Sequence, residues 1–171
     1  MNEAIRAEAL RLIAVLGLER HPEGGWYRET WRSDAVIPRG GLGPDWPDPR
    51  SCGTSIYYLL AGGEVSRVHR LRGDEVWHWY AGSRLLLHLF PAGGPYRRLE
   101  LGPRAATGPC YQAVVPGGCR FGATVAESDG FVLAGCTLAP GFDSDDFKLS
   151  RRRDLLDDFP EQTDLIHSLT R

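Results

Sequence analysis

The sequence predicts an all-β fold, an antiparallel sandwich or barrel with helices at the two ends of the chain. Between residues 26 and 149, short stretches rich in β-branched and aromatic side chains alternate with glycine and proline, as closely spaced strands and turns do. The first residues instead repeat apolar side chains at helical spacing, and the last residues carry a helical pattern interrupted by a proline. This order of elements argues against a parallel sheet with interleaved helices.

Residues 1–17 are predicted to form a helix. Ala9, Leu12 and Leu16 recur at helical spacing, and Gly17 follows as a stop signal. Charged side chains interrupt the apolar face, whereas a secretory signal needs an unbroken apolar stretch and a small-residue cleavage site. We therefore expect a cytoplasmic protein.

Residues 26–149 are predicted to form the barrel. Its expected strands are residues 26–32, 54–60, 65–71, 75–80, 84–90, 96–101, 111–115, 120–126 and 131–139. The segment 36–51 is so rich in proline and glycine that we expect a long loop without regular structure. Residues 150–171 should form a short helix, a break at Pro160 and a second helical turn. Since no repeat or domain boundary is found, residues 1–171 are expected to form a single domain.

The composition argues against several classes of partner. With 20 basic and 22 acidic residues the net charge is −2, and no basic stripe indicates nucleic acid. No apolar run approaches the length of a membrane span. None of the four cysteines forms a C-x-x-C pair, so neither a zinc ribbon nor a redox motif is indicated. The expected partner is a small-molecule metabolite, without nucleic acid or membrane.

Two stretches nearly reproduce a pair of metal-binding motifs. Gly63, His69, Glu75 and Gly82 fit the spacing G-x5-H-x-H-x3-E-x6-G, with Leu71 at the second histidine. In the second pattern, G-x5-P-x-G-x2-H-x3-N, the proline and the middle glycine match, while Cys110, Phe121 and Val125 replace the other named positions. These are the two cupin motifs, so the sequence resembles the cupin superfamily.

A broader resemblance covers nearly the whole chain. The blocks HPEGGWYRETW (21–31), TSIYYLL (54–60), HRLRGDEVWHWYAG (69–82), VVPGGCRFGA (114–123) and LAPGFDSDDFKL (138–149) occur in this order. Together they resemble the small cupin family of unknown function, the fifth cupin profile family. The resemblance implies a cupin-type antiparallel jelly-roll β-barrel, commonly a homodimer, with a pocket similar to that of nucleotide-sugar epimerases. The ligand would then be a sugar or a nucleotide-sugar.

The motif residues predict the catalytic centre. A usual cupin metal site has three histidines and one glutamate, and only His69 and Glu75 match, so we expect a site without metal or other cofactor. His69 would act as a general base with Glu75 tuning its basicity, and Tyr58 or Tyr57 would return the proton. The alternatives are a metal held by His69 and Glu75 with recruited neighbours, and a His–Glu hydrogen bond that only stabilises the barrel.

Other polar and aromatic residues are candidates for ligand binding. Arg28 or Arg70 could hold an anionic group, and Trp77 and Trp79 share the face of Glu75, where they could stack on a sugar ring or simply pack in the core. His88 and Gln112 are further candidates for lining the pocket. The polar residues around Gly24 and Gly25 fit either a pocket rim or a dimer interface. The role of His78 is left open.

The predicted function is a metal-independent isomerase or epimerase that acts on a sugar or related carbonyl metabolite by proton transfer. The alternatives are a non-catalytic cupin that binds or senses a ligand, and a metal-dependent cupin enzyme with a depleted ligand set.

Overall fold

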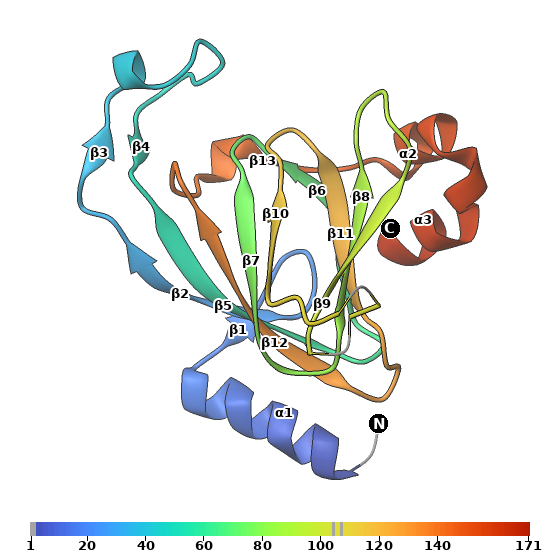
Figure 1. Ribbon diagram of the computed structural model, residues 1–171. Helices are drawn as coiled ribbons and strands as arrows, with labels where there is room; N and C mark the ends of the chain where they lie inside the picture. The colour runs from blue at the N-terminus through green and yellow to red at the C-terminus, as the bar shows by residue number, and fades with distance from the viewer. Residues whose placement is uncertain (1–2, 104, 107) are drawn as a thin grey trace.

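The chain folds into two antiparallel sheets that face each other across an apolar interior (Figure 1). The computed structural model describes residues 3–103, 105–106 and 108–171. The six-stranded sheet has the order β1 (Glu19–Arg20), β2 (Trp26–Arg32), β5 (Thr54–Ala61), β12 (Phe131–Leu138), β7 (Glu75–Gly82) and β10 (Gln112–Val115). The five-stranded sheet has the order β13 (Phe147–Leu149), β6 (Val65–Leu71), β11 (Arg120–Val125), β8 (Leu85–Phe90) and β9 (Arg97–Leu101).

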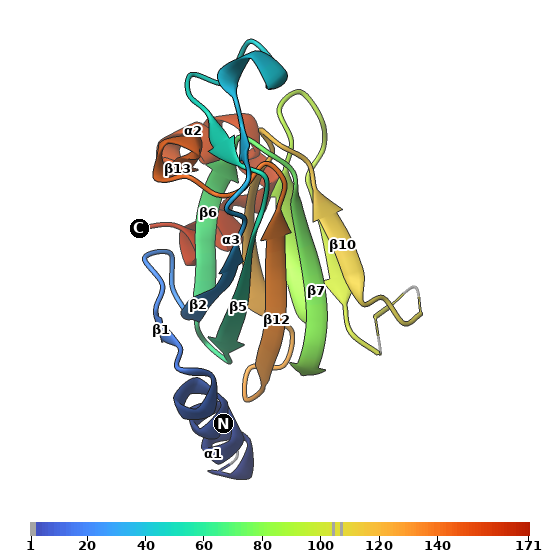
Figure 2. The ribbon, with the colours of Figure 1, turned by 90° about the vertical axis from the view of Figure 1, so that its left-hand side faces the viewer.

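This arrangement confirms the predicted jelly-roll barrel. Figure 2 faces the six-stranded sheet and shows β2, β5, β12, β7 and β10 side by side. Every strand expected from the sequence is present, with ends that differ by no more than two residues. The short strands β1 and β13 were not expected, because two or three residues are too few to carry an alternating pattern.

The segment 36–51 departs from the expectation of a loop without regular structure. Its two ends pair as strands β3 (Val36–Ile37) and β4 (Arg50–Ser51), and a 3-10 helix, η1 (Arg39–Gly41), lies between them. The resulting arm extends from the top of the barrel in Figure 1. The pairing satisfies backbone N–H and C=O groups at the two ends of the segment, and proline and glycine content alone does not predict such pairing. Arg50 fixes the arm to the barrel by two hydrogen bonds to the Asp146 carboxylate, 2.6 and 2.9 Å long.

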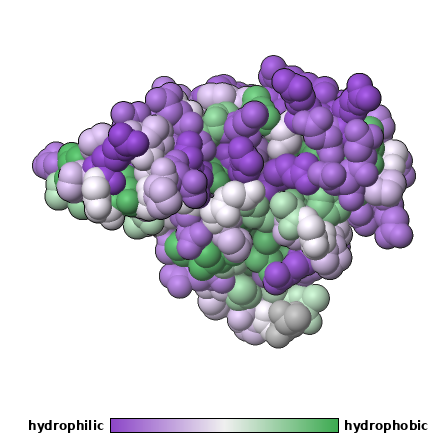
Figure 3. Space-filling view, turned by 90° about the horizontal axis from the view of Figure 1, so that it is seen from above, coloured by the Kyte–Doolittle hydropathy of each residue, from purple (hydrophilic) through white to green (hydrophobic). Residues whose placement is uncertain are grey.

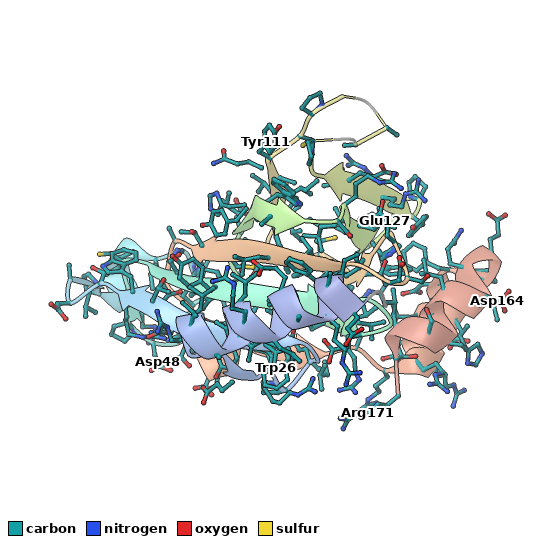
Figure 4. All side chains as sticks on the ribbon, turned by 90° about the horizontal axis from the view of Figure 1, so that it is seen from below. Trp26, Asp48, Tyr111, Glu127, Asp164 and Arg171 are labelled. Atoms are coloured by element: carbon teal, nitrogen blue, oxygen red, sulfur yellow. The ribbon has the colours of Figure 1, made fainter. Side chains whose placement is uncertain are left out.

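Helices lie against the outside of the two sheets. Helix α1 (Glu3–Leu16) crosses the six-stranded sheet, as Figure 4 shows from below, and packs on an apolar cluster that includes Leu59 and Leu133. Residues 1 and 2 of the predicted helix lie outside the described residues.

The C-terminal helices cover the other sheet. Helix α2 (Arg152–Asp158), the 3-10 turn η3 (Pro160–Gln162) and helix α3 (Thr163–Leu169) confirm the predicted break at Pro160. They bury Leu155 and Ile166 against Phe90 of β8, while their outward surface, at the right of Figure 3, is mostly hydrophilic. No helix among the described residues has the length and apolar character needed to cross a membrane.

The barrel interior contains apolar side chains from both sheets. Leu85 and Leu87 of β8, Phe121 and Ala123 of β11, and Ala134 of β12 are all almost completely buried there. Since side chains alternate along each strand, these positions define the inward face. The same face carries the polar residues described next.

Candidate functional site

A cavity of about 210 Å³ lies inside the barrel, lined by residues of both sheets. Its walls come from β2, β5, β6, β7 and β12, together with the turn before β2. The exposed Glu19, Glu29 and Arg32 form its mouth, while Glu23, His69 and Glu75 lie buried within.

Four of the predicted site residues meet in this cavity. His69 comes from β6, Glu75 and Trp77 from β7, and Tyr58 from β5. Trp77 is 2 % exposed and its ring meets the ring of Tyr58 edge-on, with centroids 5.6 Å apart. The structure therefore brings together the residues that the first motif singled out and an aromatic wall beside them.

The other predicted ligand-binding residues do not line this cavity: Arg28, Tyr57, Arg70, Trp79, His88 and Gln112. The alternation of side chains explains why three of them face away from the cavity, namely Tyr57, Arg70 and His88. Their neighbours Tyr58, His69 and Leu87 take the inward positions.

Arg70 lies instead in a groove outside the barrel, with Arg120 and Lys148. His88 hydrogen-bonds to Tyr96 and Thr124 at 2.8 and 2.9 Å.

Two further candidates lie on or beyond β7. Gln112 hydrogen-bonds through its side-chain amide to Nδ1 of His78, and the other ring nitrogen of His78 contacts the Thr137 hydroxyl. Both ring nitrogens of His78 thus have partners outside the cavity. Trp79 lies on the inward face that alternation predicts and packs against the core, but beyond the cavity, where its indole N–H donates to the Ser83 carbonyl at 2.9 Å.

His69 is a neutral histidine with one ring nitrogen available. Its Nδ1 donates to the Arg67 carbonyl at 2.7 Å and lies 3.1 Å from Oε2 of Glu23. A carbonyl only accepts, so Nδ1 carries the hydrogen and Nε2 carries a lone pair. No described residue hydrogen-bonds to Nε2, yet no fully buried side-chain nitrogen or oxygen among the described residues lacks a partner. Nε2 therefore borders the cavity that His69 lines.

The sequence predicted that Glu75 tunes the basicity of His69, but burial has the larger effect. Burial lowers the pKa of His69 to about 4. The carboxyl in contact with His69 is Glu23, not Glu75. Burial and the nearby Glu75 raise the pKa of Glu23 well above its usual range, which favours its neutral form over a carboxylate beside His69.

Glu75 is the group whose acidity suits proton transfer. It is 6 % exposed, and burial raises its pKa to about 7, although hydrogen bonds from Trp77 and Cys136 partly oppose this. The Trp77 indole N–H donates to Oε2 of Glu75 at 2.7 Å and fixes the carboxyl within the barrel. A group with this pKa is present in both its acid and its base form at neutral pH.

The hydrogen bond and the pKa of Tyr58 do not suit its predicted role as proton donor. Its hydroxyl donates to the Gly24 carbonyl at 2.7 Å, and burial raises its pKa well above the usual value. Tyr58 instead ties the turn before β2 to the barrel.

The turn HPEGG places two residues in the cavity that the sequence left undecided. Gly24 and Gly25 have φ of 117° and 72°, and a Cβ on Gly24 would stand 2.1 Å from the Val65 carbonyl oxygen. Only glycine allows this close approach, which directs Glu23 into the barrel. His21 also lines the cavity, and its Nδ1 accepts from the Glu23 backbone N–H at 3.3 Å, so Nε2 carries the hydrogen. The sequence left open a pocket rim or a dimer interface for this turn, and the geometry supports the pocket.

Ser66 and Cys136 complete the buried polar group and were not expected. The Ser66 hydroxyl donates to Oε2 of Glu23 at 3.2 Å. Alternation along β12 places Cys136 on the inward face with Ala134 and could have found it. Ser66 lies three residues before His69 and faces inward only because the pairing of β6 with β11 shifts register between them, which the sequence pattern does not show.

The cavity does not fit a cupin metal centre. Leu71 and Phe121 occupy the positions of two of the usual histidines, both are at least 95 % buried, and the ring of Phe121 lies 4.2 Å from that of His69, centroid to centroid. Within the described residues, no three His, Cys, Asp or Glu side chains converge closely enough to hold an ion.

Comparison with known proteins agrees with the fold and the motif residues. Residues 10–150 match the profile of the family described as Cupin superfamily (DUF985). The chain belongs to the DUF985 family. No curated protein matches the sequence.

Several solved structures are similar to this chain. A protein from Shewanella oneidensis is 38 % identical, with 94 % of this chain and 96 % of that chain aligned and a TM-score of 0.81. A hypothetical protein from Leishmania major is 33 % identical over 95 % and 98 % of the two chains, with a TM-score of 0.82. Oxalate decarboxylase from Bacillus subtilis is 13 % identical, aligns with 88 % of this chain and 36 % of that one, and has a TM-score of 0.52, a likeness of fold alone.

Proposed function

We propose that this DUF985 protein is a metal-independent isomerase or epimerase that transfers a proton on a small carbonyl metabolite such as a sugar. The observation that carries the proposal is the meeting of Glu75, with a pKa of about 7, and a neutral His69 with a free Nε2 in one cavity inside the barrel. Carboxyls of raised pKa in a pocket are typical of general acid–base catalysis.

The side chains support a complete proton-transfer sequence. The Glu75 carboxylate removes a proton from the carbon next to the carbonyl, and the electron pair of the broken C–H bond forms an enolate. The Nε2–H of neutral His21 can donate to the oxygen on which negative charge develops. Nε2 of His69 accepts a hydrogen bond from a substrate hydroxyl and orients the substrate. The hydroxyl on the deprotonated carbon then passes its proton to the enolate oxygen and becomes the new carbonyl, while Glu75 returns its proton to the former carbonyl carbon. This sequence balances and completes an aldose–ketose isomerisation without any other reactant.

The size of the cavity limits the substrate. Its 210 Å³ is below the roughly 300–1,000 Å³ of pockets that hold drug-sized ligands. A monosaccharide-sized molecule therefore suits the cavity better than a whole nucleotide-sugar, whose nucleotide would remain outside. The shape supports the sugar part of the predicted ligand and not the nucleotide.

Deuterium incorporation from D2O tests the proposal. The protein is treated with a chelator and incubated with a panel of aldoses and ketoses, and carbon-bound deuterium is measured by mass spectrometry. We expect incorporation with at least one compound, and a loss of about 10²–10⁴-fold with Glu75→Gln, the range typical of one general base.

Two matched variants control for damage to the fold. His78 lies on β7 like Glu75 but outside the cavity, so His78→Asn should leave deuterium incorporation unchanged. His69→Asn should reduce it. Binding of a sugar without any incorporation would overturn the isomerase and favour the non-catalytic binding protein. Incorporation that is unchanged in Glu75→Gln would remove Glu75 from the mechanism.

A further inference from the structure

We infer that the substrate of the barrel cavity carries a positively charged amine and no anionic group, which rests on the proposed function in taking this cavity as the substrate site. The inference comes from a mismatch of charge inside the barrel. Two carboxyls are buried in the cavity without a lysine or arginine partner among the described residues, and Arg32 at its mouth is already occupied.

Glu23 and Glu75 lack the counter-charge that buried carboxylates ordinarily have. They are 5 % and 6 % exposed, and neither forms an ion pair with a lysine or arginine among the residues that the structure describes. The side chain of Glu23 contacts histidine and serine side chains, and that of Glu75 contacts Trp77 and Cys136. Buried acidic groups are normally paired with a cation or held neutral. An ammonium in the cavity would supply the missing partner.

An anionic substrate group would find no free lysine or arginine among the described residues that line the cavity. Arg32 lines the mouth, but its Nε and Nη2 donate to the Glu29 carboxylate at 3.0 and 2.7 Å, and its Nη1 donates to the Phe142 carbonyl at 2.9 Å. Arg67 is close enough to lower the pKa of Glu23 slightly, yet its guanidinium donates to the Pro22 carbonyl and does not line the cavity. A phosphate or carboxylate would therefore meet Glu19, Glu23, Glu29 and Glu75 without compensation.

The lining also matches an ammonium in hydrogen-bond character and shape. An ammonium has three donors and no acceptor. The lone pair on Nε2 of His69 and the oxygens of Glu23 and Glu75 are acceptors for it. The edge-on pair of Tyr58 and Trp77 provides aromatic surface of the kind that attracts cations.

A metal ion is a poorer candidate for the missing cation. The donors of the cavity do not converge in threes among the described residues, so an ion would find too few ligands at once. An organic ammonium needs single hydrogen bonds from separated acceptors, which this arrangement offers.

Three probes that differ mainly in charge test the inference: glucosamine, glucose and glucuronate. Binding is measured by calorimetry and does not depend on turnover. We expect glucosamine to bind at least about tenfold more tightly than glucose, as one added charged hydrogen bond would give, and glucuronate not to bind. Glu23→Gln should reduce the preference for the amine to less than about threefold, while Glu161→Gln, an exposed control, should keep it.

A second measurement needs only the unaltered protein, in case Glu23→Gln folds poorly. The carboxyls ionise when the ammonium arrives, so glucosamine binding should release protons and its heat should depend on the ionisation enthalpy of the buffer. Equal affinity for glucose and glucosamine, tighter binding of glucuronate, or tight binding of Mg²⁺ or Zn²⁺ alone would overturn the inference. Deuterium incorporation into neutral sugars without amine preference would overturn it too, yet leave the proposed function standing. Preferential binding of glucosamine without deuterium incorporation would support the inference and overturn the proposed function.

Discussion

Replacing Glu75 with glutamine should remove a pH dependence from the stability of the folded protein. Burial raises the pKa of Glu75 from 4.5 to about 7 in the folded state. The folded protein therefore holds a proton that the unfolded chain has released between these values, and its stability falls as the pH rises. Glutamine is neutral at every pH and keeps most of the shape of the side chain.

The size of the effect follows from the two pKa values. Each pH unit between them corresponds to about 1.4 kcal/mol. The protonated carboxyl thus contributes about 3 kcal/mol that is fully present below pH 4.5 and is lost as the pH rises through about 7. Between about pH 5 and about pH 8, the parent should lose some 2–3 kcal/mol relative to Glu75→Gln. Glu23 acts in the same direction, because burial and, to a smaller extent, Glu75 raise its pKa.

Guanidinium unfolding followed by tryptophan fluorescence measures this difference at the two pH values. Other buried groups titrate in both proteins and largely cancel in the comparison. Glu161→Gln alters an exposed carboxyl and should follow the parent. A stability difference between parent and Glu75→Gln that is the same at both pH values would refute the reasoning, since Glu75 would then be ionised in the folded protein like any surface carboxyl.

Three further predictions concern metal, assembly and the turn before β2. Protein purified without added metal should contain well under one equivalent of iron, nickel, manganese or zinc by elemental analysis, and stoichiometric metal lost on replacement of His69 would contradict this. We still expect a homodimer in sedimentation experiments, in which Tyr80 and Val114, about half exposed on the six-stranded sheet, would be covered; a monomer at micromolar concentration argues against it. Gly24→Ala should lower the free energy of unfolding by roughly 1–3 kcal/mol, because the alanine Cβ would stand 2.1 Å from the Val65 carbonyl oxygen. An unchanged midpoint of chemical denaturation would show that the turn can move.

The fold could be predicted because its signals are local. The strands β2 and β6 begin and end where the alternating pattern does, and the break at Pro160 follows from the missing N–H of proline. The ends of the arm were missed, because two-residue strands carry no pattern of their own. Their pairing depends on tertiary contacts such as the one between Arg50 and Asp146, which are 96 residues apart.

The site was predictable only where a motif or alternation fixes the direction of a side chain. His69, Glu75 and Trp77 follow from the first motif and the period of β7. The position of Glu23 depends on how closely Gly24 approaches β6, a contact between segments distant in sequence. The pKa of His69 is lowered by burial, which the spacing of the motif does not indicate.

The pH dependence of deuterium incorporation by metal-stripped protein tests the central claim most directly. With the substrate well below saturation, so that the rate reports kcat/KM, the account predicts that incorporation increases with pH through an apparent pKa near 7, the value that burial sets for Glu75 in the free protein, and that chelator does not reduce it. Glu75→Gln should abolish both the incorporation and its rise with pH. A profile without a pKa near 7, or incorporation that returns only when metal is added, would contradict the claim that a buried carboxyl performs the proton transfer.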